Sequence, residues 1–148
     1  MDVSKAVSTL NDLIETCRDG ENGFRTAAAS VKDHHLKGLF ERYSRQRAEM
    51  ARELQDQVRR LGSDPAKLGS VSGSLHRGWI NIKTLVTGHD DNAIVAEAER
   101  GEDAAKAAYQ DALKEELPAG ARELVEQQAA IVREAHDQVR HLEKTGAQ

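Results

Sequence analysis

The sequence contains few aromatic residues, few prolines and almost no cysteine. Of its 148 residues, only five are aromatic, two are proline and one is cysteine. Strands favour aromatic and β-branched side chains, so this shortage argues against a β-sandwich and favours packed helices. A chain of 148 residues suits one domain with one core. We therefore expect residues 1–148 to form a single all-α domain.

Long apolar runs and an excess of positive charge are also missing. The net charge of −4 at pH 7 gives no electrostatic reason to expect nucleic acid or an anionic membrane as a partner. No segment approaches the length of a membrane span, and the N-terminus has no apolar stretch behind a basic start. The single cysteine, Cys17, cannot form a disulfide within the chain. We expect a cytoplasmic protein.

Apolar residues recur at helical spacing along most of the chain. The spacing predicts long helices over Val3–Val31, over a second run that ends at Leu61, from about Asn92 to Glu116, and from Pro118 to near the C-terminus. A Gly/Ser-rich linker, "GSDPAKLGSVSGS", and a short amphipathic helix, "LHRGWINIKTLV", separate the second and third. So long a crossover favours ferritin-like connectivity, and an up-down-up-down bundle is the alternative.

Two Gly-Glu pairs lie inside the predicted helices. Gly20-Glu21 is in the first helix, close to Gly23, and Gly101-Glu102 is in the third. A glycine inside a helix costs about 1 kcal/mol relative to alanine, so each needs a structural reason. We expect the close approach of a neighbouring backbone or a bulky side chain. The two glutamates face either inward or into solvent.

Four segments carry a resemblance to a known family: "LIETCRDGENGFRTAA", "LFERYSRQRAEMARELQ", "GSLHRGWINIKTLV" and "AERGEDAAKAAYQDAL". Together they resemble a bacterial group of ferritin-like four-helix-bundle proteins known as a domain of unknown function. The resemblance covers nearly the whole chain. It implies a ferritin-like four-helix bundle with a short extra helix in the crossover between helices 2 and 3, and it implies no activity.

The wider ferritin-like superfamily binds two metal ions between a Glu on the first and third helices and an E-x-x-H pair on the second and fourth. This sequence lacks the pattern, because no histidine has a glutamate three residues before it. Arg47 and Met50 stand on the inward stripe of the second helix where Glu and His are needed. Arginine cannot ligate a metal, and its charge repels one.

We therefore predict a degenerate metal site without a cofactor and without catalytic residues. In its place we expect a buried polar cluster in which Arg47 pairs with two glutamates and an amide completes the hydrogen bonds. The four residues predicted to form it are Glu21, Arg47, Glu102 and Gln128.

Two alternative sites remain open. An unusual di-iron or di-manganese site would draw its ligands from Glu21, Glu49, Glu99, Glu102, Glu134, His136 and Asp137. Against it, acids three or four residues apart are common on helices of this composition and usually pair with Arg or Lys at the surface. A small-ligand or anion pocket would use His76, Arg77 and Trp79 at the start of the crossover helix. Alternatively, Trp79 fills the side of the bundle while the other two stay in water.

Two functions of different classes follow. The first is a non-catalytic ferritin-like bundle that acts through self-association, as a homodimer, or through an unknown protein partner. The alternative is a metal-binding protein of the di-iron or di-manganese carboxylate type, with a role in oxidative stress or metal handling. We expect Cys17 to be a small apolar core residue under either function.

Overall fold

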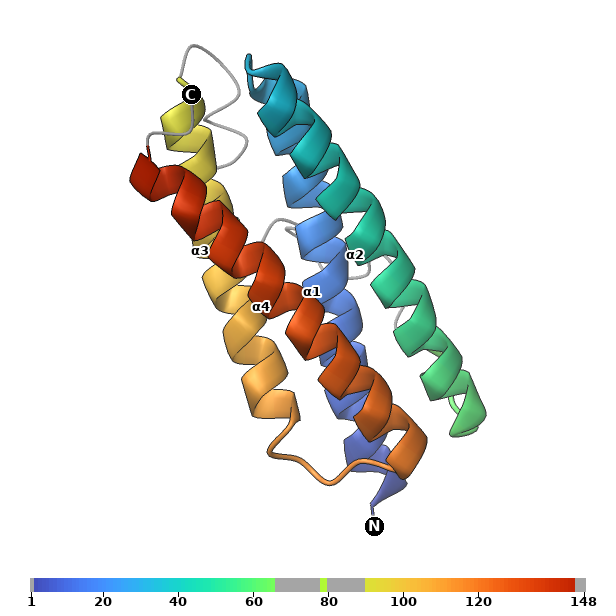
Figure 1. The fold of residues 1–148 in the computed structure, drawn as a ribbon. Helices are drawn as coiled ribbons and strands as arrows, with labels where there is room; N and C mark the ends of the chain where they lie inside the picture. The colour runs from blue at the N-terminus through green and yellow to red at the C-terminus, as the bar shows by residue number, and fades with distance from the viewer. Residues whose placement is uncertain (1, 66–77, 80–89, 146–148) are drawn as a thin grey trace.

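The computed structural model describes residues 2–65, 78–79 and 90–145. In this part of the chain four α-helices pack into a bundle: α1 (Val3–Ser30), α2 (His34–Arg60), α3 (Asp91–Ala112) and α4 (Ala119–Thr145) (Figure 1). The all-α prediction is confirmed. None of these helices is both long and apolar enough to cross a membrane.

Aspartate side chains cap three of the helices. Asp2, Asp33 and Asp90 each accept a hydrogen bond from the backbone N–H three residues on, which satisfies a donor that the first helical turn leaves free. The third helix ends at Ala112, earlier than the predicted Glu116, because the backbone from Leu113 onward tightens into turns that lead to Pro118.

Contacts at the two ends of the bundle fix the direction of α3. At one end, the Asp91 carboxylate accepts hydrogen bonds of 2.9 Å from the backbone N–H groups of Lys32 and Asp33, which join α1 to α2. At the other end, Lys5 near the start of α1 forms an ion pair with Glu115, just after α3, with 3.2 Å between Nζ and Oε1. Hence α3 runs antiparallel to α1 and in the same direction as α2 (Figure 1). This is the ferritin-like connectivity, and the up-down-up-down alternative is wrong.

Within residues 66–89 of the crossover between α2 and α3, the structure describes only Gly78 and Trp79. The rest of the predicted short helix, including His76 and Arg77, lies outside the described residues. Neither of the two described residues is helical, and Gly78 has a φ of +100°, which favours glycine. The Trp79 side chain is buried, with 1% of its surface exposed, so it fills the side of the bundle.

The glycines inside the helices make room for two large side chains. A Cβ atom at Gly23 or at Gly101 would stand 2.2 Å from the indole of Trp79, which is therefore held between α1 and α3. At Gly20, a Cβ atom would stand 3.2 Å from Nη1 of Arg47. The expectation that these glycines permit close approach is confirmed.

The apolar core consists of two clusters. One surrounds Leu13, Met50 and Tyr109, and the other surrounds Phe24, Phe40 and Trp79. On α4 the core residues include Val125 and Val132. The neighbouring Leu124 and Ile131, each one position earlier on the helix, are only half-buried. Between the two clusters, at the level of residues 47 and 102, the interior is polar.

The fit of Trp79 against glycine gives the first prediction. Gly101→Ala should destabilise the protein by about 1–3 kcal/mol, because overpacking the indole outweighs the gain in helix propensity. Gly38→Ala is the matched control, since this helical glycine has nothing within 4 Å of its added Cβ. The control should stabilise by about 0.5–1 kcal/mol. Urea unfolding measures both, and equal effects would contradict the packing argument.

Candidate functional site

The centre of the bundle contains a buried ion pair between α2 and α3. Nη1 of Arg47 donates to Oε2 of Glu102 at 2.7 Å, and Nη2 donates to Oε1 at 2.6 Å. The two side chains are 1% and 0% exposed. This fork-to-fork geometry pairs both charges and uses both carboxylate oxygens at once.

The surroundings of Arg47 keep its guanidinium charged. Burial alone lowers its pKa, but attraction to Glu102 and the hydrogen bonds to that carboxylate outweigh burial and raise the pKa. The guanidinium carbon also lies 5.4 Å from the centre of the Phe24 ring, within range of a cation–π contact. Within the described residues, Nε of Arg47 has no hydrogen-bond partner.

A second buried polar chain lies next to this ion pair and links all four helices. The Tyr109 hydroxyl donates to Oε1 of Gln128 at 2.7 Å and lies 3.2 Å from Sγ of Cys17. Nε2 of Gln128 donates to the backbone carbonyl of Met50 at 3.1 Å and to Oε1 of Glu53 at 3.0 Å. The amide of Gln128 thereby satisfies its donors and its acceptor inside the core.

The structure corrects the predicted four-residue cluster in two ways. Glu21 is half-buried on α1, where its carboxylate pairs with Arg18 at 2.6 Å and Arg25 at 3.9 Å instead of with Arg47. Its position in the helix turns it away from the α2–α3 contact. Gln128 is buried as expected, but it bonds to Tyr109 and not to the ion pair.

The residues in the centre do not fit two metal ions. Such a site needs several free carboxylates and imidazoles directed at one cavity. Here both oxygens of the Glu102 carboxylate are bonded to a cation, and the neighbouring buried chain includes the amide of Gln128, the phenol of Tyr109 and the thiol of Cys17. The centre of the bundle therefore does not fit the two-metal chemistry of the superfamily.

The alternative metal ligands do not form one cluster. Glu49 pairs with Arg52 on the exposed face of α2, and Glu102 is taken up by Arg47. Glu134 is exposed on α4. The pKa of Tyr43 on α2 is raised by burial, then by the charge of Glu102 and, to a smaller extent, by that of Glu134. Among the described residues, none of these three glutamates, nor Glu21, belongs to a group of three ligand atoms that lie close together.

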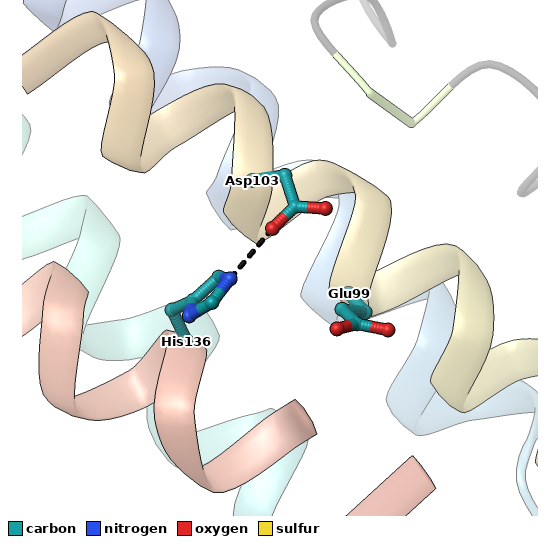
Figure 2. Close-up of side chains that lie close together, drawn as sticks. All are labelled: Glu99, Asp103 and His136. Carbon is teal, nitrogen blue, oxygen red and sulfur yellow. Dashed lines mark hydrogen bonds and ion pairs between the residues drawn. The ribbon is translucent and has the colours of Figure 1, made fainter. Parts of the chain in front are cut away.

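Two of the remaining candidates, Glu99 and His136, do meet on the flank between α3 and α4, together with Asp103, which was not among the predicted ligands. Glu99, Asp103 and His136 each offer a ligand atom, and these atoms lie within 4.8 Å of one another (Figure 2). Nε2 of His136 is 2.6 Å from Oδ1 of Asp103, and its Nδ1 is 3.2 Å from Oδ1 of Asp137. We name Glu99, Asp103 and His136 the flank cluster.

The sequence reasoning missed Asp103, which holds the flank cluster together. The signal was available, because Asp103 lies four residues after Glu99 and so shares its helix face. The Gly-Glu pattern drew attention to the neighbouring Glu102 instead, whose side chain points into the core. The hydrogen bonds of Tyr109 to Cys17 and Gln128 depend on contacts between helices, which the local sequence pattern does not show.

Of the three residues predicted to form a pocket, the structure describes Trp79. The indole fills the space between α1 and α3, and His76 and Arg77 lie outside the described residues.

A groove of about 360 Å³ lies between the first half of α1 and the C-terminal end of α3. It is lined by Thr9, Asp12, Leu13, Thr16, Ala108, Asp111, Ala112 and Glu115.

Removing one charge of the ion pair should lower the unfolding free energy far more than removing both charges together. Arg47→Met leaves Glu102 buried without a partner, and we expect it to cost about 3–5 kcal/mol of unfolding free energy. Adding Glu102→Leu to that variant should recover most of the loss, since a matched apolar pair needs no charge compensation. Urea unfolding at pH 7 measures both, with the exposed Glu49→Gln as control. An additive loss in the double variant would refute the pairing.

Burial of Cys17 predicts a loss of stability in alkali. Burial raises the pKa of its thiol from 9.0 to about 11, although Tyr109 and Arg47 partly offset this. Because the folded pKa is the higher one, the stabilisation is complete below pH 9.0 and is lost as the pH rises towards 11. Urea unfolding between these pH values should show a shallower decline for Cys17→Ala.

The same burial should make Cys17 inert in the native protein. At pH 8 we expect a thiol reagent to modify it only after the chain is unfolded, since the thiolate is the reactive form. Rapid modification of the folded protein would show that the thiol is accessible.

The comparisons with known proteins agree with this fold. No curated protein matches the sequence. A structure of a mutant Dps1 protein from Mycobacterium smegmatis superposes with a TM-score of 0.75 over 95% of this chain and 96% of that chain, at 14% sequence identity. The likeness shows that the fold is the ferritin-like bundle of Dps. A family described as a domain of unknown function, DUF2383, matches residues 5–115. The chain therefore belongs to the DUF2383 family.

Proposed function

We propose that this protein is a non-catalytic ferritin-like bundle that acts by associating with a second copy of itself or with another protein. The observation that carries the proposal is the ion pair between Arg47 and Glu102, which takes the place of metal ligands in the centre of the bundle. A cation held at that point repels metal ions.

The free-energy cost of separating Arg47 from Glu102 favours a permanent ion pair over a metal site that is only temporarily empty. To free Glu102 for a metal ion, Arg47 would have to leave its only carboxylate partner within the described residues. Separating a buried pair leaves an uncompensated charge, at a cost of about 3–5 kcal/mol. The guanidinium also has little room to move, because it lies against Gly20 on one side and near the Phe24 ring on another.

The fold supports association, and the character of the surface limits the kind of interface that can form. Helical bundles offer long faces on which identical copies can pair about a two-fold axis. In the described part of the chain Val3 is the exposed large apolar residue, so the helix faces are mainly polar. A homodimer with a polar, salt-sensitive interface fits such faces better than one with an apolar interface.

One observation favours a second candidate function, metal handling. The flank cluster brings an imidazole and two carboxylates together outside the centre of the bundle. A role of this kind would not need the central chemistry of the superfamily.

The proposal predicts that the protein neither oxidises iron at its centre nor behaves as a monomer. Light scattering coupled to size exclusion should give twice the mass of one chain. Oxygen consumption on addition of Fe²⁺ should not depend on Glu102, because that carboxylate is already paired. We would compare the wild type with Glu102→Gln, after circular dichroism has confirmed that both are folded.

His136→Gln separates the two ways in which iron could be oxidised. Oxidation that requires Glu102 but not His136 would overturn the non-catalytic proposal. Oxidation that requires His136 alone would leave the centre inert and place the chemistry on the flank. A monomer at all concentrations and salt levels would overturn self-association, and the search would move to other protein partners.

A further inference from the structure

We infer that the flank cluster is a mononuclear site for a divalent transition-metal ion. Its ligands are the carboxylates of Glu99 and Asp103 on α3 and the imidazole of His136 on α4 (Figure 2). Carboxylate and imidazole together suit Zn²⁺, Mn²⁺ and Fe²⁺, and three protein ligands leave open positions for water. This site is separate from the superfamily's central metal pair, and the inference rests on and deepens the second candidate function, metal handling.

The positions of the three residues are what such a site requires. Glu99 and Asp103 are four residues apart, so α3 presents both carboxylates on one face. The ring of His136 reaches across from α4 and points at this pair (Figure 2). Ligand atoms around one ion at about 2.0–2.2 Å lie no more than about 4.4 Å apart, and the three present here already lie within 4.8 Å.

The ring of His136 is oriented by a second carboxylate, as is common for histidines that bind metal ions. Its side chain is 4% exposed, and Nδ1 lies 3.2 Å from the carboxylate of Asp137. A carboxylate on one ring nitrogen fixes the ring and leaves the other nitrogen to the metal, which is the common outer-shell arrangement. Here the other nitrogen, Nε2, faces Asp103.

The local charge also suits a dication. Three carboxylates surround the ring: Glu99, Asp103 and Asp137. Among the described residues, Arg140 is the cation paired with this group, through a contact of 3.9 Å from its Nε to Glu99. That arginine is 55% exposed, so its compensation is weak.

Only a small movement is needed for an ion to enter. Nε2 of His136 and Oδ1 of Asp103 are 2.6 Å apart, whereas two ligands of one ion are separated by about 3.0–3.4 Å. Asp103 is 61% exposed and can shift by that amount without disturbing the core. Its neighbour Glu102 points into the bundle, so metal binding at Asp103 leaves the central ion pair in place.

The test is Zn²⁺ binding to the full chain, measured by calorimetry and by metal analysis after dialysis. We expect one Zn²⁺ per chain and a rise in Tm on its addition. Asp103→Asn and His136→Gln should each weaken binding at least tenfold. Asp137→Asn should weaken it by about 10–100-fold, as expected for a residue that orients a ligand. Arg140→Gln should strengthen it, because a competing cation is removed.

Matched controls separate this site from others. His141→Gln removes an exposed histidine from the same helix, and Glu49→Gln removes an exposed, arginine-paired acid. Both should bind Zn²⁺ like the wild type. Asp103 is the safer test of the flank cluster, since its exposed side chain can be changed with the fold intact.

Two results would overturn the inference. Absence of stoichiometric Zn²⁺ in the folded wild type would mean that the three residues only tie α3 to α4. Zn²⁺ that is bound equally by the wild type and Asp103→Asn would lie elsewhere. Loss of Zn²⁺ binding in Glu102→Gln, but not in Asp103→Asn, would place the ion in the centre of the bundle and would also overturn the proposed inert centre. Comparing the two variants therefore distinguishes failure of this inference from failure of the proposed function.

Discussion

The ion pair between Arg47 and Glu102 is the interaction on which the interior of this bundle depends. It lies between two apolar clusters and joins α2 to α3 across the middle of the molecule. Taking two charges out of water is expensive, so the bidentate geometry must be kept for the fold to be stable. Helices that slid past one another would break it. The pair therefore fixes register in a core otherwise made largely of interchangeable aliphatic side chains.

The other unusual features of the core accommodate this pair and the nearby tryptophan. Gly20 leaves space beside the guanidinium, while Gly23 and Gly101 leave space for the indole of Trp79. Trp79 comes from the crossover, so the connection that makes the topology ferritin-like also supplies a core residue. The cost of glycine inside two helices is offset by the burial of these two large side chains.

Polar chemistry in this protein is thus divided between the inside and the flank. At residues 102 and 103, consecutive carboxylates face in different directions because each residue of a helix is rotated by about 100° from the last. Glu102 neutralises Arg47 in the core, and Asp103 meets His136 between α3 and α4. The first contact makes the centre unsuitable for metal, and the second creates a group of ligands where the superfamily pattern predicts none.

The sequence by itself determined the helices, the ferritin-like family of folds and the failure of the central metal pattern. Helical periodicity and the missing E-x-x-H motif are local properties, and the segment between α2 and α3 is long enough to indicate a crossover. Only the tertiary structure decided which partner each polar residue takes. Glu21 and Glu102 follow glycine alike, yet one pairs along its own helix and the other across the bundle. Likewise, the meeting of His136 with Asp103 depends on how α4 is rotated against α3, which packing of the whole core sets.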